Sequence, residues 1–184
     1  ANSHQAAVER DLRAALEKPE PSLLRGALVL ARLDMPELEV DAYEERIGRL
    51  AGEFVATLGP DPAAVPPADR LVKLNDFFFR ENGFHGARFD YGNRANSRLP
   101  EVLDDREGIP IMLCMLYMEI GRRGGLDLVG LPRPGHFVVG LRPAPDGPLT
   151  VIDVFDGGVT LDEPQTAALP PASPRDMIFR MLNN

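Results

Sequence analysis

The first sixty residues carry apolar side chains at helical spacing, with charged residues between them. Residues 1–17 predict a short, weakly amphipathic helix, which the Pro-Glu-Pro segment 19–21 ends. A second helix is predicted over 22–31, with a serine as its N-cap. The clearest pattern follows, because residues 34–37 resemble a capping box with a proline inside the first turn. The apolar residues from 38 to 58 then fall mainly on one helical face.

A connector with four prolines follows at residues 59–68. Its composition predicts a boundary between an N-terminal helical subdomain, residues 1–60, and a core domain, residues 61–184. Apolar spacing from Leu71 to Phe78 predicts another helix, which ends near Asn82-Gly83. Residues 83–96 show no sustained period and predict an extended, ordered loop.

Residues 108–126 form the stretch around which the chain is organised. Ser97 is predicted to cap a short helix that Gly108 ends. Pro110 suits the first turn of the next helix, where its missing N–H costs nothing. The run that follows is almost wholly apolar until Gly124-Gly125, which predicts a buried central helix.

The last third of the chain changes to strand-like patterns. Residues 126–131, 135–141, 149–155 and 159–161 predict short strands, the middle two forming a hairpin across 143–148. A Pro/Ala-rich loop is predicted over 164–172. Ser173 then caps a final helix, with Pro174 in its first position, that runs through Met181. Helices followed by a small antiparallel sheet indicate the α+β class.

Composition narrows the possible functions. The chain has 184 residues, is 44% hydrophobic and carries a formal net charge of −8 without a basic tract, which argues against a nucleic-acid partner. No apolar run approaches the roughly 18 residues of a membrane span. The single cysteine cannot form an internal disulfide, so we predict a reducing, cytoplasmic setting.

Three residues suggest chemistry. Cys114 lies on the central helix, His136 begins one strand and Asp153 lies in the next, which makes a candidate thiol, base and orienting acid. Each residue also has an ordinary structural explanation: a small buried cysteine, a core histidine with satisfied hydrogen bonds, and a carboxylate that needs a partner. In either case we expect His136 to pair with Asp153.

Other polar residues give weaker signals. Asn96 is predicted either to line the same cleft or simply to cap a helix, and Gly135 is expected beside His136 in the cleft. His85 and Asp90 lack further ligands at suitable spacing, so no metal site and no cofactor are predicted.

The order of several short motifs is similar to that of the SirB-type bacterial transglutaminase-like family, to which a domain of a eukaryotic F-box protein is also similar. The resemblance covers about Leu71 to Met181 and rests on Leu74-Asn75, Gly83-Phe84-His85-Gly86, Asp90-Tyr91, Asn96-Ser97, Val102-Leu103, Gly108-Ile109-Pro110-Ile111, Pro134-Gly135-His136-Phe137 and Ile152-Asp153. It implies a papain/transglutaminase-like core, in which a cysteine opens the central helix and a histidine and an aspartate lie on successive strands. His136 and Asp153 match the last two.

The resemblance places the nucleophile near residues 110–112, at the start of the central helix, where the helix dipole lowers a thiol pKa. Cys114 lies about one turn further in. We therefore expect a non-catalytic domain that acts as a binding or regulatory module for an unknown protein or peptide partner. The alternative is a thiol-dependent amide or ester hydrolase or acyltransferase with Cys114, His136 and Asp153 as its triad. The resemblance also implies helical repeats beyond residue 184.

Overall fold

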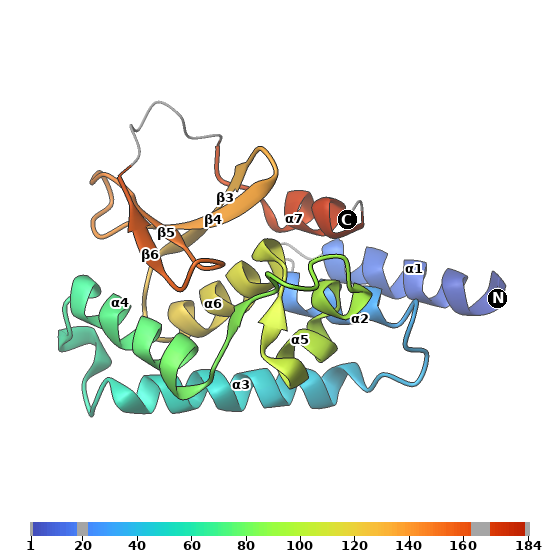
Figure 1. The fold of residues 1–184 in the computed structure, drawn as a ribbon. Helices are drawn as coiled ribbons and strands as arrows, with labels where there is room; N and C mark the ends of the chain where they lie inside the picture. Colours follow the sequence, from blue (N-terminus) through green and yellow to red (C-terminus); the bar gives the residue numbers. More distant parts are fainter. Residues whose placement is uncertain (1, 18–21, 163–169, 183–184) are drawn as a thin grey trace.

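The structure, a computed structural model, describes residues 2–17, 22–162 and 170–182. A four-stranded antiparallel sheet lies on one side of a central helix and the other helices surround the rest of it (Figure 1). The helices are α1 (Asn2–Leu16), α2 (Leu23–Ala31), α3 (Val40–Thr57), α4 (Pro67–Asn75), α5 (Leu99–Asp105), α6 (Pro110–Arg123) and α7 (Pro174–Leu182). The predicted α+β class is confirmed.

The main sheet has the order β3-β4-β5-β6, with every neighbouring pair antiparallel. Its strands are β3 (Leu128–Arg133), β4 (His136–Leu141), β5 (Thr150–Asp153) and β6 (Val159–Leu161). Two very short strands, β1 (His85–Gly86) and β2 (Glu107–Gly108), pair in parallel just before α6. The pairing of β2 with β1 therefore fixes the backbone position from which the chain enters α6.

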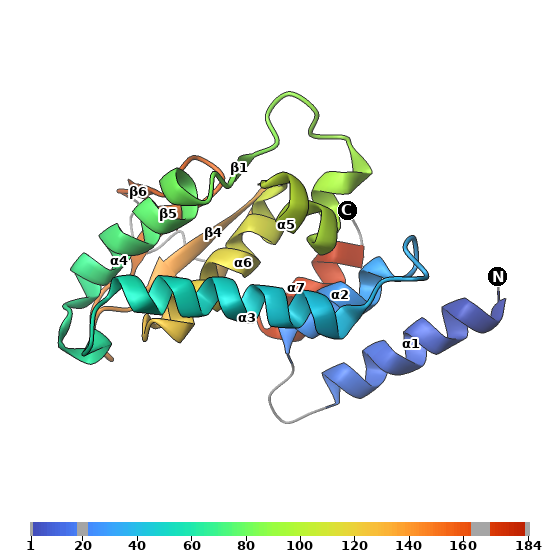
Figure 2. The same cartoon turned by 90° about the horizontal axis from the view of Figure 1, so that it is seen from below.

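Helix α6 is buried on nearly all sides, as its apolar sequence predicts. Leu113, Leu116 and Ile120 have no accessible surface. One side of α6 packs on α3 and the other on β3 and β4, and α3 crosses beneath it (Figure 2). The predicted boundary near residue 60 stays a prediction, but Ile47 and Phe54 of α3 belong to the same hydrophobic core as α6.

The predicted capping box at residues 34–37 is wrong. Helix α3 begins at Val40, and its N-cap residue is Glu39. Residues 34–37 instead belong to the turns that follow α2, where the Met35 N–H donates to the carbonyl of Ala31. Polar residues and proline suit such turns as well as they suit a helix start, so the motif does not distinguish the two.

The predicted bounds of α5 are also corrected. Ser97 ends a 3-10 turn, and Arg98 takes the N-cap position of α5. The helix ends at Asp105, and its C-cap residue Arg106 adopts a left-handed conformation with φ of 63°, whereas Gly108 pairs in β2. In contrast, Ser22 caps α2 as predicted, because its Oγ accepts from the Arg25 N–H at 3.2 Å.

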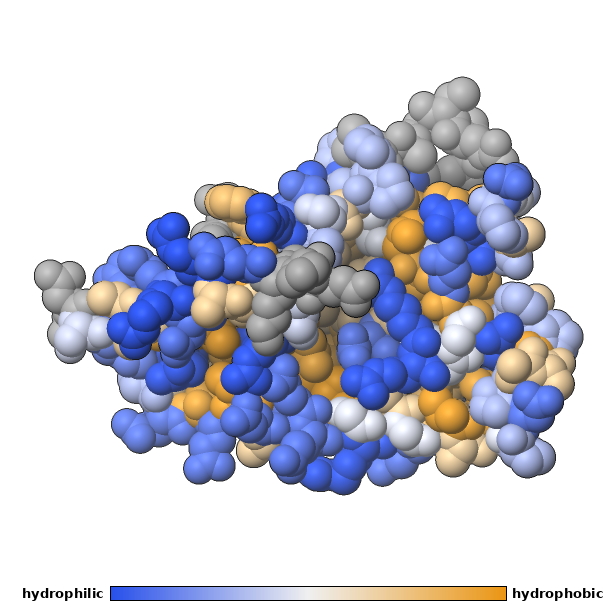
Figure 3. Space-filling view, turned by 180° about the vertical axis from the view of Figure 1, so that it is seen from behind, coloured by the Kyte–Doolittle hydropathy of each residue, from blue (hydrophilic) through white to orange (hydrophobic). Residues whose placement is uncertain are grey.

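Two predicted features lie mostly outside the described residues: the Pro-Glu-Pro break at 19–21 and the loop over 164–172. Across the face opposite to that of Figure 1, hydrophobic surface shows only in patches between hydrophilic residues (Figure 3). None of the helices in the described ranges combines the length and the apolar character needed to span a membrane.

Candidate functional site

A tight turn places His136 at the start of β4. Arg133 and His136 face each other as the last pair of the β3–β4 hairpin, so only Pro134 and Gly135 form the loop. Gly135 has φ of +66°, a left-handed conformation that glycine adopts without strain. Proline followed by such a glycine is typical of a type II turn. The Pro-Gly-His sequence therefore fixes where the imidazole emerges from the sheet.

The expected hydrogen bond between His136 and Asp153 is present. The Nε2 atom of His136 lies 2.9 Å from Oδ2 of Asp153, which ends β5. The other carboxylate oxygen accepts from the N–H of Asp156 at 3.1 Å. Both side chains are largely buried, with 30% of His136 and 15% of Asp153 exposed. Two donors thus hold the carboxylate in a fixed orientation.

This pairing decides which ring nitrogen the site offers. An ionised carboxylate only accepts hydrogen bonds, so Nε2 of His136 carries the hydrogen in this contact. Nδ1 is then the nitrogen left for a ligand or a proton transfer. The ring also meets Phe155 edge-on, with the centroids 6.0 Å apart, which limits its rotation. The arrangement could accept a proton, orient a ligand donor, or do both.

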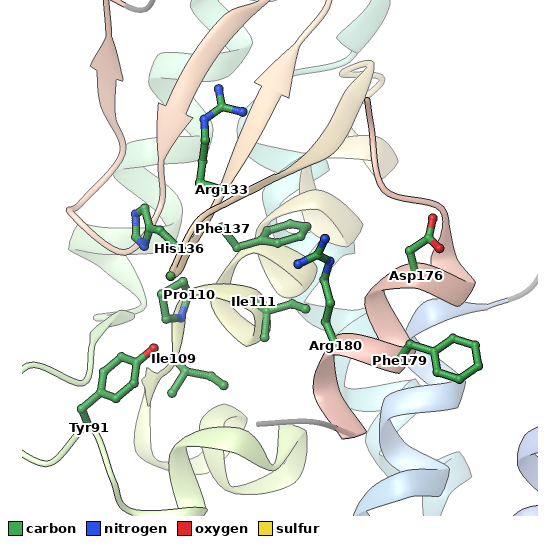
Figure 4. Close-up of a pocket in the computed structure, with 11 residues that line it drawn as sticks. Tyr91, Ile109, Pro110, Ile111, Arg133, His136, Phe137, Asp176, Phe179 and Arg180 are labelled. Carbon is green, nitrogen blue, oxygen red and sulfur yellow. The ribbon is translucent and has the colours of Figure 1, made fainter. Parts of the chain in front are cut away.

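A cavity of about 690 Å³ opens beside the imidazole. Its walls come from the start of α6, the turn at Gly135, the loop that carries Tyr91, and helix α7 (Figure 4). A second hollow of about 390 Å³ shares Tyr91, Pro110, Gly135 and His136 with the first. The two hollows form one region around His136, which we call the His136 cleft. Gly135 lines it, as expected.

The start of α6 contributes only apolar side chains to the His136 cleft. Ile109, Pro110 and Ile111 line it, and Pro110 is the first residue of the helix. In the predicted thiol-enzyme arrangement, the nucleophile would come from this position. None of these three side chains has a nucleophilic atom.

Cys114 lies one turn below Pro110 and does not line the cleft. Its side chain has no accessible surface, and its Sγ donates to the carbonyl of Phe137 at 3.5 Å. Burial raises the pKa of the Cys114 thiol well above its ordinary value, and the negative charge of Asp153 raises it further. The structure therefore keeps the sulfur close to the pair but behind β4, in its neutral form.

Asn96 does not line either hollow; instead it braces the loop beneath them. Its side-chain N–H donates to the carbonyl of Asp90 at 2.6 Å, and its backbone carbonyl accepts from the N–H of Ile109 at 3.0 Å. It thus joins the Tyr91 loop to the residue that precedes α6. It is 4% exposed, and these backbone partners explain how a buried amide is tolerated.

The sequence reasoning missed several cleft residues, among them Arg133, Phe179, Tyr91 and Arg180. Tyr91 appeared only within the family motif, although an aromatic residue in a loop rich in glycine and asparagine is itself a signal. Arg180 gave no signal, because only the packing of α7 against α2 brings it to the cleft.

Residues 41–183 match the transglutaminase-like superfamily. The chain is 34% identical over 140 residues to the UPF0162 protein of Xylella fastidiosa, covering 76% of this chain and 48% of that protein. It is 29% identical over 140 residues to the UPF0162 protein of Vibrio cholerae, covering 74% and 49%. A shorter match, 34% over 86 residues, covers 47% of this chain and 13% of human F-box only protein 21. The chain thus spans about half the length of the bacterial relatives, and no solved structure matches.

Proposed function

Because the chain belongs to the transglutaminase-like superfamily, we propose that it is a non-catalytic domain of the SirB type that works as a binding or regulatory module in the cytoplasm. Its ligand, a protein or peptide, occupies the His136 cleft. The hydrogen-bonded pair of His136 and Asp153 is retained to shape the cleft and to contact this ligand, without a covalent step.

This proposal rests mainly on the identity of the first residue of α6, which lines the cleft together with His136. Pro110 occupies the first position of α6, where a thiol would gain acidity from the helix dipole. The single thiol of the chain lies one turn deeper, without access to solvent. A neutral, buried thiol is neither accessible to a substrate carbonyl nor present as the reactive thiolate.

One observation favours the alternative, a thiol hydrolase or acyltransferase. The 2.9 Å contact between His136 and Asp153 has the form of the base and the orienting acid of a catalytic triad. In that mechanism the Cys114 thiolate attacks an amide or ester carbonyl, the imidazole holds the thiol proton, and the leaving amine or alcohol takes it. Water or an amine then resolves the acyl-enzyme. This route requires β4 to move away from the sulfur.

The test is the reactivity of the single thiol. Alkylation of Cys114 by iodoacetamide is followed from about pH 5 to about pH 9 in the folded protein, in the His136→Ala variant and, as a control, in the His85→Ala variant. We expect no modification in any of the three until denaturant is added. Rapid alkylation well below pH 8.5 that is lost only in His136→Ala would refute the proposal and establish an activated thiolate.

A further inference from the structure

The charge of the His136 cleft differs from that of the chain as a whole. The chain carries a formal net charge of −8, yet the larger hollow of the cleft is lined by Arg133, His136 and Arg180 and by one carboxylate, that of Asp176. The guanidinium of Arg180 points into the cavity, toward the ring of Phe137 (Figure 4). A cation directed into a hollow of an acidic protein attracts an anion there more than elsewhere on the surface.

The nearest acidic residue on α7 is already engaged. Asp176 stands one turn before Arg180, and its carboxylate accepts from both the N–H and the hydroxyl of Ser173, at 3.0 and 2.7 Å. These bonds form the N-terminal cap of α7. In the described parts of the chain, Arg180 has no ion pair with any carboxylate. Its charge does act on Asp176, whose pKa it helps to lower, but no carboxylate in these parts binds the guanidinium directly, so its N–H donors are available to a ligand.

The walls next to this charge are apolar. Ile109, Ile111 and Phe137 lie along the cavity below and beside the guanidinium (Figure 4). The hydroxyl of Tyr91, which is directed toward the start of α6, adds a donor at the other end. A volume of about 690 Å³ lies within the range of roughly 300–1,000 Å³ that ligand sites occupy. The cleft therefore suits a ligand with an apolar group close to a carboxylate.

We propose that the His136 cleft binds the C-terminal residue of a peptide or protein chain, with its α-carboxylate on Arg180 and its apolar side chain against Ile111 and Phe137. This inference rests on the proposed function and names the chemistry of the ligand.

Chain geometry favours a C-terminus over an internal acidic residue. A terminal residue carries its carboxylate and its side chain on the same Cα atom, so one residue reaches both the arginine and the apolar wall. In an extended internal segment, neighbouring side chains point to opposite faces. An internal glutamate and its apolar neighbour would therefore be directed to opposite walls. Arginine binds a carboxylate through two parallel hydrogen bonds, which adds specificity to the charge.

The test uses three peptides in a series, in which each peptide differs from the one before it at a single group. They are acetyl-glycyl-alanyl-leucine as the free acid, the same peptide as its C-terminal amide, and acetyl-glycyl-glutamyl-leucine amide, which has only an internal carboxylate. Each is titrated into ¹⁵N-labelled protein, and binding is read from the amide shifts of Ile111, Gly135 and Phe137. We expect the free acid to bind about tenfold more tightly than either amide.

Two variants assign this preference to one side chain. Arg180→Gln keeps most of the stem and removes the charge, and it should reduce the preference for the acid to less than about twofold. Arg80→Gln makes the same change at a well-exposed arginine that does not line the cleft, and it should leave the preference intact. The preference should also weaken as salt is raised, because an ion pair is screened.

Three results would overturn the inference. These are equal binding of the acid and its amide, tighter binding of the internal glutamate, or shifts confined to residues outside the cleft. Equal binding of acid and amide within the cleft would still leave a binding module. An alkylation-sensitive Cys114, by contrast, would refute the proposed function whatever the peptides do.

Discussion

Placing a thiol at the start of α6 tests whether the His136 cleft still has the geometry of a thiol site. The variant is Pro110→Cys in a Cys114→Ala background, so that the introduced thiol is the only one in the chain. Position 110 is the first residue of a 14-residue helix and shares both hollows with His136. The imidazole and the helix dipole therefore act together on this thiol.

The expected effect can be estimated. A thiol with an ordinary pKa of about 8.5 is about 0.3% ionised at pH 6, whereas a pKa of about 6.5 gives about 24%, roughly 75 times more thiolate. A more acidic thiolate is a weaker nucleophile, and a Brønsted coefficient of about 0.45 reduces the gain by about eightfold. We therefore expect alkylation at pH 6 to be about tenfold faster than for an ordinary exposed thiol.

The chain offers a matched control. Pro67 also stands at the first position of a helix, α4, and does not line the His136 cleft. Iodoacetamide rates at pH 6 are compared between Pro110→Cys and Pro67→Cys, both in the Cys114→Ala background, with and without His136→Ala. Only the thiol at position 110 should lose its advantage when His136 is removed. Equal rates at the two positions would refute the placement of the imidazole beside the helix start.

Three further substitutions test the packing that supports the cleft. Tyr117→Phe removes the hydroxyl that donates to the Asn75 side chain at 2.6 Å, and urea unfolding should show a loss of about 1–3 kcal/mol because a buried oxygen loses its donor. Gly86→Ala would place a Cβ 2.7 Å from an aromatic ring of the β5–β6 turn, and overpacking should cost about 1–3 kcal/mol in the same assay. Hydrogen bonds from Ser173 hold the pKa of Asp176 below its ordinary value, so Ser173→Ala should raise that pKa in an NMR titration. In the unmodified chain, the stabilisation from this cap is fully present above the ordinary carboxyl pKa. It is lost as pH falls through the lowered pKa of Asp176.

Controls on the surface separate these effects from general damage. Tyr43→Phe removes a hydroxyl bonded to Asp104 at an exposed site, and Gly92→Ala adds a Cβ with no heavy atom within 4 Å. Both should change the free energy of unfolding by less than about 0.5 kcal/mol. If Tyr43→Phe or Gly92→Ala lowered the free energy of unfolding as much as Tyr117→Phe or Gly86→Ala, respectively, burial would not explain the loss of stability. An unchanged Asp176 titration in Ser173→Ala would contradict the proposed cap.

Local signals account for the parts of the fold that the sequence predicted. Pro110 at the helix start, Gly125 just after its end and Gly135 in the hairpin turn each have a restricted or left-handed backbone conformation. These conformations give the bounds of α6 and the position of β4. They also explain why the pairing of His136 with Asp153 was predictable, since neighbouring strands of a hairpin bring such residues together.

The rest of the site depends on contacts between distant segments. Arg180 reaches the cleft only because α7 packs on α2. Asn96 was predicted either to line the cleft or to cap a helix, but its side-chain amide donates to the carbonyl of Asp90 while its backbone carbonyl accepts from Ile109. Capping motifs failed at residues 34–37 and at Ser97 because the same residue types also form turns. No local pattern distinguishes these outcomes.

The pair of His136 and Asp153 does not by itself distinguish an enzyme from a binding domain. The side chain of Asp153 is 15% exposed, and its backbone carbonyl also accepts the Gly158 N–H at 2.8 Å, which closes the β5–β6 turn. A largely buried carboxylate that lost the imidazole donor would destabilise this turn. The pair therefore has a structural role at this turn whether or not a proton is ever transferred. What separates the two functions is the group at the start of α6 beside the imidazole, and in this chain that group is Pro110, whose side chain has no nucleophilic atom.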